Sequence, residues 1–268
     1  MKTIFYQLFT FVAILISSTS LLSQEIIFVK GAKGEAAING SISLNEARDQ
    51  ALQNAKIEAL QKAGIAENLS SYEMLFKGEI GKDFTELFSS QTQSEIRGAV
   101  KSYTAVEEKF VDSTTQLFTI RVTIDAEVIR YQTEQDPEFQ VQVEGINPLY
   151  SNNDKLQFTV RVTKSCFLTI FSVTENEASL IFPNKYETDM SVASGKIITY
   201  PQKVDYIFEK SIKGLEHNRL IFVFTKSKID FIDFTGVDQI STIEKILSWI
   251  YSINPDQRRI VFAPTIVR

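Results

Sequence analysis

Residues 166–184 read Cys-Phe-Leu-Thr-Ile-Phe-Ser-Val-Thr-Glu-Asn-Glu-Ala-Ser-Leu-Ile-Phe-Pro-Asn. Two apolar runs, 167–173 and 178–182, flank a polar turn, and this order is typical of a β-hairpin. The hairpin closes with Phe182-Pro183-Asn184, in which proline fixes the backbone and asparagine offers both a donor and an acceptor. The stretch predicts a β-rich module in the second half of the chain.

Similar apolar runs recur through the second half at intervals of roughly ten residues. Further strands are expected at 139–143, 156–162, 196–200, 206–208 and 220–224. Helical spacing over 239–253 predicts one helix, and 260–267 predicts a last strand in which Pro264 is typical of a sheet edge. We therefore expect a sandwich or barrel-like domain with one C-terminal helix over residues 138–268.

The first half is organised around an alanine-rich helix. Ser43-Leu44-Asn45-Glu46 has the form of a capping box, and Gly64 is a typical helix stop. The apolar positions between them recur on one face, at Leu44, Ala47, Ala51, Leu52, Ala55, Ala59, Leu60 and Ala63. Because alanines allow a close approach, we expect this face to pack on a sheet, and Leu52→Asp to unfold the module.

The remaining elements of the first half are predicted to complete an α+β domain over residues 24–133. A strand is expected at 26–29, an interrupted helix at 71–95, and an antiparallel hairpin at 100–111 and 116–130. The run Gly31-Ala32-Lys33-Gly34 is interpreted as a turn. The polar segment 133–138, which contains Pro137, is the expected domain boundary. The predicted fold class is thus α+β, with a helix on an antiparallel sheet followed by the β-rich domain.

The first 23 residues have the pattern of a secretory signal peptide. Lys2 precedes the apolar run Ile4–Ile16, and small residues follow up to Ser23. The alternative is an uncleaved anchor, although the apolar run is shorter than the roughly 20 residues of a spanning helix. No later segment reaches that length, so no transmembrane segment is expected after cleavage. The predicted location is the periplasm or the exterior, in association with the envelope.

Composition excludes some classes of protein. The chain has 268 residues, 44% of them apolar, with 28 Lys and Arg against 33 Asp and Glu. A net charge of -5 without basic blocks argues against nucleic acid as a partner. Cys166 is the only cysteine, so no internal disulfide is expected, and its apolar surroundings favour a structural thiol over a reactive one.

No catalytic, metal-binding or cofactor-binding pattern emerges from the sequence. His217, the only histidine, is expected in a solvated loop, and it is separated along the chain from Cys166. Asp230, Asp233 and Asp238 lack EF-hand spacing and instead favour a charged strand edge. The candidate binding surface consists of Phe182, Pro183, Asn184 and Tyr186, whose alternative interpretation is a stiff strand-exit turn.

Two resemblances add to these predictions. Residues 26–130, with Ala47-Arg48 opening the helix and Ala63-Gly64 closing it, resemble the N-terminal domain of flagellar assembly protein T and related envelope lipoproteins. That resemblance implies an export-side α+β building block without known catalysis, although this chain lacks the lipid-bearing cysteine of the lipoproteins. Residues 155–228, with Leu168-Thr169-Ile170-Phe171, Leu180-Ile181-Phe182-Pro183-Asn184 and Tyr200-Pro201, resemble an uncharacterised bacterial envelope domain with a Leu-x-Phe-Pro-Asn signature.

The function expected from these observations is non-enzymatic binding or scaffolding in the cell envelope, in the assembly or maintenance of an envelope machine. The partners would be other envelope proteins, whose identity and number the sequence leaves open. The alternative is a cell-wall or glycan hydrolase that uses paired carboxylates, because 33 acidic residues allow many such pairs.

Overall fold

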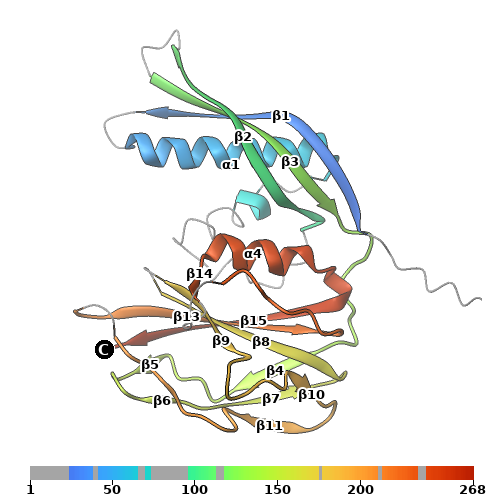
Figure 1. The fold of residues 1–268 in the computed structure, drawn as a ribbon, viewed down its shortest axis with the longest axis vertical. Coiled ribbons are helices and arrows are strands. Elements are labelled where there is room, and N and C mark those ends of the chain that lie inside the picture. Colours follow the sequence, from blue (N-terminus) through green and yellow to red (C-terminus); the bar gives the residue numbers. More distant parts are fainter. Residues whose placement is uncertain are drawn as a thin grey trace, which may run out of the picture.

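A computed structural model describes residues 24–38, 42–65, 70–73, 96–112, 118–174, 177–210, 213–234 and 240–268 (Figure 1). The predicted leader and residues 74–95 of the expected second helix lie outside these ranges, and residues 70–73 are helical.

The elements are β1 (Glu25–Ile38), α1 (Leu44–Lys62), β2 (Gly98–Asp112), β3 (Phe118–Arg130), β4 (Val141–Glu144), β5 (Leu149–Tyr150), β6 (Lys155–Leu156), β7 (Phe158–Val162), β8 (Cys166–Val173), β9 (Ala178–Phe182), β10 (Ser191–Val192), β11 (Ile197–Tyr200), β12 (Tyr206–Ile207), β13 (Glu216–Thr225), β14 (Ile240–Ser241), α4 (Ile243–Ser252), a 3₁₀ turn (Pro255–Gln257) and β15 (Arg258–Val267). The predicted α+β class is confirmed.

The first module is a three-stranded antiparallel sheet with α1 on one face (Figure 1). The strand order is β1-β3-β2, and β2 and β3 form the predicted hairpin. Alternate residues of β3, such as Ile120, Val122 and Ile124, are buried in the same core as α1. This alternation is expected of a sheet that is covered on one side.

Both ends of α1 follow the local sequence signals. The backbone N–H of Ser43 donates to Glu46 Oε2 at 2.9 Å, and the N–H of Glu46 donates to Ser43 Oγ at 3.3 Å. These reciprocal bonds form the predicted capping box. The helix ends at Lys62, and Gly64 follows with a φ of 71°, which favours glycine.

Gly34 sets the distance between α1 and the sheet. The alanines of the helix face, including Ala51 and Ala55, have no exposed surface. A Cβ added at Gly34 would lie 1.9 Å from the carbonyl oxygen of Ala51 and 2.2 Å from the nitrogen of Ala55. The backbone of β1 therefore contacts the backbone of α1 at a position that only glycine can occupy.

The prediction of a turn over Gly31–Gly34 was wrong, because these residues lie within β1. Strand β1 continues to Ile38, well past the predicted 26–29. Gly31 has a φ of 60° and lies in a β-bulge between Val29 and Ala32, where the register with β3 shifts. The glycines thus allow a bulge and a close helix contact rather than a chain reversal.

The buried face of α1 differs from the prediction at its margins. Leu44 is 42% exposed and Leu52 is half-buried, so a charge at Leu52 would reach solvent, and Leu52→Asp is expected to destabilise rather than unfold the module. Lys56, in contrast, is only 3% exposed. Its ammonium lies 3.7 Å from a carboxylate oxygen of Glu244 on α4 and 4.7 Å from the ring centre of Tyr103.

The second module was predicted to be a sandwich or barrel-like domain, and it has two β layers that enclose a core (Figure 1). A seven-stranded sheet has the order β14-β9-β8-β13-β15-β5, with β10 also paired to β8. The second layer contains the sheet β11-β7-β4. The core between them includes Phe158, Val160, Leu168, Ile170, Phe222 and Phe224.

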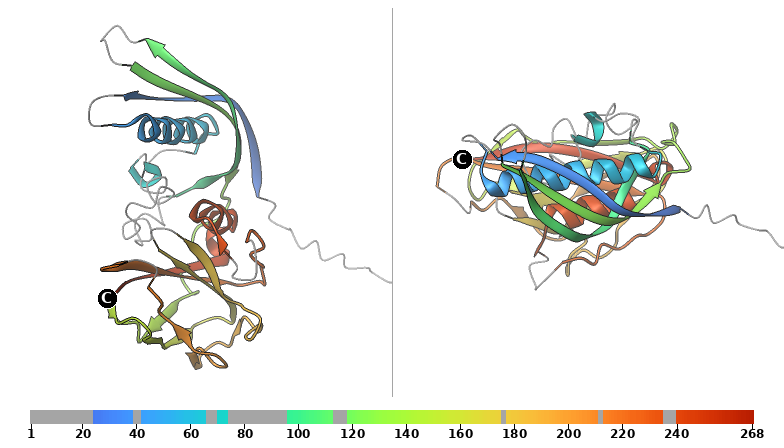
Figure 2. Two further views of the ribbon diagram at one scale, coloured as in Figure 1. Left: turned by 60° about the vertical axis from the view of Figure 1, so that its left-hand side comes forward. Right: turned by 90° about the horizontal axis from the view of Figure 1, so that it is seen from above.

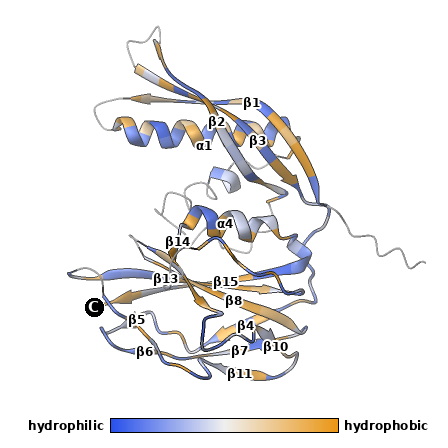
Figure 3. Cartoon of the chain, in the orientation of Figure 1, coloured by the Kyte–Doolittle hydropathy of each residue, from blue (hydrophilic) through white to orange (hydrophobic). Residues whose placement is uncertain are grey.

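Helix α4 covers the other face of the seven-stranded sheet (Figure 2). Phe171 and Ile221, which alternate with residues of the sandwich core, pack in one cluster with Ile246 and Ile250 of α4. Burial on both faces explains the continuous apolar runs of β8 and β13, which Figure 3 colours as hydrophobic. The predicted C-terminal helix is confirmed with shorter bounds, and β15 is the predicted last strand.

The prediction of a charged strand edge around Asp230 and Asp233 was wrong, because residues 228–234 form no strand. Phe231 instead packs edge-on against Phe171, at 5.0 Å between ring centres, and against Trp249, at 5.6 Å. Burial of this aromatic ring fixes the segment over α4 and leaves both aspartates at the surface. Asp238 lies outside the described residues.

Helix α4 also contacts the first module, because it lies between the two sheets (Figure 2). Ser248 donates a hydrogen bond to the carbonyl oxygen of Lys101 on β2 at 3.0 Å. Residues of α1, β3 and α4 belong to one continuous apolar cluster. No helix within the described ranges combines the length and the apolar content needed to cross a membrane.

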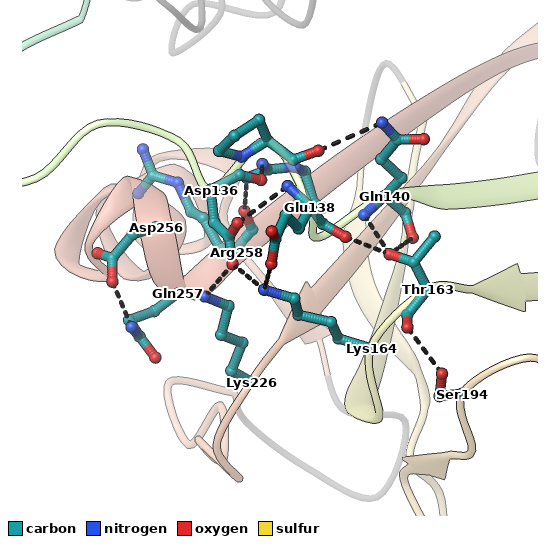
Figure 4. Close-up of polar contacts among 12 residues, drawn as sticks. Asp136, Glu138, Gln140, Thr163, Lys164, Ser194, Lys226, Asp256, Gln257 and Arg258 are labelled. Carbon is teal, nitrogen blue, oxygen red and sulfur yellow. Dashed lines mark hydrogen bonds and ion pairs between the residues drawn. The ribbon is translucent and has the colours of Figure 1, made fainter.

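The connection between the modules is held by a charged cluster around Asp136 (Figure 4). Asp136 Oδ2 accepts hydrogen bonds from Lys164 Nζ at 2.8 Å and Lys226 Nζ at 2.6 Å. Lys164 also pairs with Glu138, and Arg259 donates to the carbonyl oxygen of Asp136. The bonds from Lys164 and then Lys226 hold the pKa of Asp136 well below its usual range.

Candidate functional site

One face of the seven-stranded sheet changes from apolar to polar along its strands. On β8, Leu168 and Ile170 belong to the sandwich core, and Ser172, the next residue on that face, lines an open cleft. On β13 the corresponding change runs from Phe222 to Asn218. Figure 3 shows the hydrophilic beginning of β13 beside its hydrophobic remainder. The cleft therefore lies where the core of the sandwich ends.

The cleft has a volume of about 710 Å³. Its floor is formed by β8, β9 and β13, and its walls are the turn after β9 and the segment around β12. This volume lies within the range of small-molecule sites. The lining residues are Leu156, Ser172, Thr174, Glu177, Ser179, Leu180, Ile181, Asn184, Lys185, Tyr186, Val204, Asp205, Tyr206, Ile207, Phe208, Glu209, Glu216, Asn218 and Leu220.

Asn184 builds the turn that forms one wall. Its Oδ1 accepts from the backbone N–H groups of Tyr186 at 2.9 Å and Glu187 at 3.0 Å. Its Nδ2 donates to the carbonyl oxygen of Ile181 at 2.9 Å and to the hydroxyl of Tyr206 at 3.2 Å. With its side-chain bonds made inside the protein, Asn184 positions Tyr186 rather than presenting an amide to a ligand.

Glu187 connects this turn to the opposite wall. The carboxylate is 4% exposed and accepts from the hydroxyl of Tyr206 at 2.8 Å and from the backbone N–H of Lys203 at 2.7 Å. It also accepts from the N–H of Gln202. Burial, followed by the bond to Glu187, raises the pKa of Tyr206, so this hydroxyl stays protonated and the contact persists at neutral pH.

Asn218 is the polar group at the floor of the cleft. It is 9% exposed, and its Oδ1 accepts from Ser172 Oγ at 3.0 Å. Among the described residues, no acceptor lies within hydrogen-bond distance of its Nδ2. This amide lines the cleft, and its Nδ2 has no acceptor among the described residues. Its N–H groups are therefore available to a ligand.

The described lining residues give the cleft an acidic character. They include the carboxylates of Glu177, Asp205, Glu209 and Glu216, against the single ammonium of Lys185. Asp205 pairs with Lys155 at 2.6 Å, outside the cleft lining. Glu177 and Glu209 are exposed and have no ion-pair partner among the described residues. The field in the cleft therefore favours positively charged groups.

The four residues of the predicted binding surface do not form one surface. Phe182 is 1% exposed and belongs to the sandwich core, so its placement at the surface was wrong. Pro183 and Asn184 are half-buried in the turn. Tyr186 is 58% exposed and lines the cleft. The motif thus supplies one wall of the site through Asn184 and Tyr186.

The sequence analysis missed Asn218, Glu187 and Tyr206. The sequence does indicate the polar floor of the cleft, because polar residues replace apolar ones at alternate positions of β13, in Glu216-His217-Asn218-Arg219-Leu220. Glu187 had no such signal, because its partners become known only once the chain is folded.

The other candidate residues lie apart from the cleft. His217 is exposed as expected, but on β13 rather than in a loop. Cys166 is buried at the far end of β8, near Thr225, about 26 Å along β13 from His217. The two are therefore too far apart to act as a pair. The described residues contain no group of His, Cys, Asp and Glu able to hold a metal ion.

A comparison with protein families gives a match in the same region. The model of a family described as Domain of unknown function (DUF4384) matches residues 149–226, from β5 to just past β13. This fits an uncharacterised bacterial domain, and the matched segment contains every described residue that lines the cleft. No curated protein matches the chain. The match does not reach residues 26–130, where the similarity to flagellar assembly protein T remains a prediction.

Proposed function

We propose that this protein is exported and associated with the envelope, and that it binds another envelope component in the cleft without transforming it. The observation that carries the proposal is the amide of Asn218, which is 9% exposed at the cleft floor with no acceptor for its Nδ2 among the described residues. The Nδ2 atom is not enclosed by the protein but opens onto the cleft, where a ligand that supplies an acceptor can form a hydrogen bond with it.

The rigidity of the walls supports binding. Asn184, Tyr206 and Glu187 form a closed hydrogen-bond network that holds both walls in place before a ligand arrives. A preformed site loses little conformational entropy on binding. The signal peptide predicted over residues 1–23 would deliver this site to the periplasm or the exterior, where it could serve in the assembly or maintenance of an envelope machine.

The alternative function is hydrolysis of cell-wall glycans by paired carboxylates. The observation that favours it is the presence of Glu177 and Glu216 in the lining of one cleft. Binding and hydrolysis differ in one measurable respect, because a hydrolase releases soluble fragments from cell-wall material and a binding protein does not.

The proposal is tested by site-specific cross-linking in intact cells that express the full chain with its leader. A photo-cross-linking amino acid replaces Tyr186 in the cleft wall or, as a control, Ile232, which is 78% exposed outside the cleft. We expect defined cross-linked products in the envelope fraction from position 186 and not from position 232. Purified protein incubated with cell-wall material should release no fragments.

Three results would overturn the proposal. Recovery of the whole protein in the cytoplasm would refute export. Identical cross-linking from both positions would refute a role for the cleft. Fragment release that is lost in Glu216→Gln would establish the hydrolase instead.

A further inference from the structure

We propose that the ligand of the cleft is a basic peptide segment, whose Lys or Arg side chains face the carboxylates while a backbone carbonyl accepts a hydrogen bond from Asn218 Nδ2. This inference rests on the proposed binding function and specifies its ligand. Three features of the cleft support it: the charge of the lining, the donor on the floor and the aromatic wall.

The charge of the lining selects cations. The described lining residues carry four carboxylates and one ammonium. Asp205 is already paired with Lys155, whereas Glu177 and Glu209 have no cation partner among the described residues. An anionic ligand would be repelled by the carboxylates of Glu177 and Glu209, whereas a positively charged side chain would be attracted to them.

The donor on the floor requires an acceptor that a simple amine lacks. Asn218 uses Oδ1 for Ser172, so the group that it offers to the cleft is the N–H of Nδ2. A polyamine carries only donors when it is protonated, as does a lysine ammonium. A basic peptide carries both cationic side chains and carbonyl oxygens. Its side chains can pair with the carboxylates while a carbonyl oxygen accepts from Asn218 Nδ2.

The aromatic wall already contacts a cation within the protein. The ammonium of Lys185 lies 4.8 Å from the ring centre of Tyr186. Tyr186 is 58% exposed, so its ring remains accessible from the cleft. A guanidinium or ammonium of a bound peptide can make the same kind of contact with this ring.

Binding is measured by fluorescence anisotropy with the mature chain and a labelled, end-blocked Gly-Lys-Gly-Arg-Gly peptide. The same peptide with glutamine at both basic positions is the matched control. We expect the basic peptide to bind about tenfold more tightly than the neutral one at low salt, and the difference to shrink at high salt. Equal affinity for the two peptides, or no binding of the basic peptide, overturns the proposal.

Two charge variants locate the site. Glu177→Gln with Glu209→Gln is expected to raise the Kd of the basic peptide about five- to tenfold, because two exposed attractions are lost. Glu144→Gln with Asp233→Asn removes two exposed carboxylates outside the cleft lining and should leave the Kd unchanged. Equal effects of the two pairs would mean that the peptide responds to overall charge, which contradicts the proposal.

Asn218→Ala separates a peptide from a polyamine. The substitution removes the Nδ2 donor and adds no charge. A peptide carbonyl would lose its hydrogen bond, so peptide binding should weaken, whereas spermidine binding should be unchanged because its attraction to Glu177 and Glu209 remains. Unchanged binding of both ligands would refute the carbonyl contact. If Asn218→Ala fails to fold, the exposed pair Glu177 and Glu209 still decides whether the cleft selects basic peptides.

The proposed function and its ligand can fail separately. Cross-linking to envelope components from position 186 with no preference for the basic peptide would sustain a binding cleft and reject this ligand class. Loss of the position-specific cross-links would reject the binding cleft itself.

Discussion

The hydroxyl of Tyr131 donates a hydrogen bond of 2.5 Å to the backbone carbonyl oxygen of Tyr251, 120 residues further along the chain. Tyr131 follows β3 of the first module, and Tyr251 lies in α4. The guanidinium of Arg258 lies 5.3 Å from the ring centre of Tyr131 and 4.8 Å from that of Tyr251. Arg258 also donates to the carbonyl oxygens of Ile250 and Ile253 at the end of α4. The two modules are therefore joined by a buried polar contact.

Tyr131→Phe should lower the free energy of unfolding by about 1–2 kcal/mol, because a buried hydrogen bond between the modules is lost. Urea unfolding followed by circular dichroism measures the change. Tyr200→Phe is the matched control, since Tyr200 is 2% exposed and its hydroxyl has no hydrogen bond among the described residues. Equal effects of the two substitutions would show that the contact with Tyr251 contributes nothing.

Gly34→Ala should destabilise the first module by at least about 3 kcal/mol, because the added methyl group would overlap the backbone of α1 at Ala51 and Ala55. Gly31→Ala, in the same strand, is the control. At Gly31 a Cβ meets no atom within 4 Å, so only the cost of a φ of 60° remains, about 1–2 kcal/mol. Thermal unfolding of both variants compares the two costs, and a milder effect at Gly34 would contradict the close contact.

Asp136→Asn should reduce stability at neutral pH and have less effect in acid. The pKa of Asp136 is lowered in the folded state by Lys164 and Lys226, so its ionised form stabilises the fold. That contribution is complete above the unfolded pKa of about 4 and is lost progressively as the pH falls from there through the lower pKa of the folded state. Unfolding measured from pH 6 down to pH 3 should therefore show the two proteins converging. A constant difference across this range would exclude the ionised Asp136 as the cause.

Cys166 should resist thiol reagents in the folded protein. It is 3% exposed, and burial raises its pKa to about 12, so almost no thiolate is present at pH 8. Labelling with a chromogenic disulfide at pH 8 should be slow for the native chain and complete within minutes in denaturant. Rapid labelling without denaturant would show that β8 opens readily.

Much of the fold could be predicted because its signals are local. The capping box at Ser43 and Glu46, the glycine after α1 and the alternation of β3 each depend on a few neighbouring residues. The turn predicted at Gly31–Gly34 failed because glycine serves both chain reversal and close packing, and only the position of Ala51 distinguishes the two uses. Lys56 was missed for the same reason, since its partner Glu244 lies on a distant helix.

The site was predicted only in part because its polar floor depends on strand register. Asn184 and Tyr186 follow one another in a recognisable motif, so their turn could be found from the sequence. Ser172 and Asn218 are 46 residues apart and meet only through the pairing of β8 with β13. A reading of alternate positions on each strand indicates that the core ends there, but the partner strand must be known to place the cleft.

The ten-residue ladder between β13 and β15 bears on how this domain can be studied in isolation. The family match ends at residue 226, before β15 begins. A fragment cut at the borders of the match would lack β15, so one edge of β13 would be unpaired. It would also lack α4, so the apolar sheet face that this helix covers would be exposed. Such an edge readily recruits strands from other molecules. The minimal folding unit therefore extends to the C-terminal residues, and polymerisation of a shorter piece would reflect the cut rather than a property of the native protein.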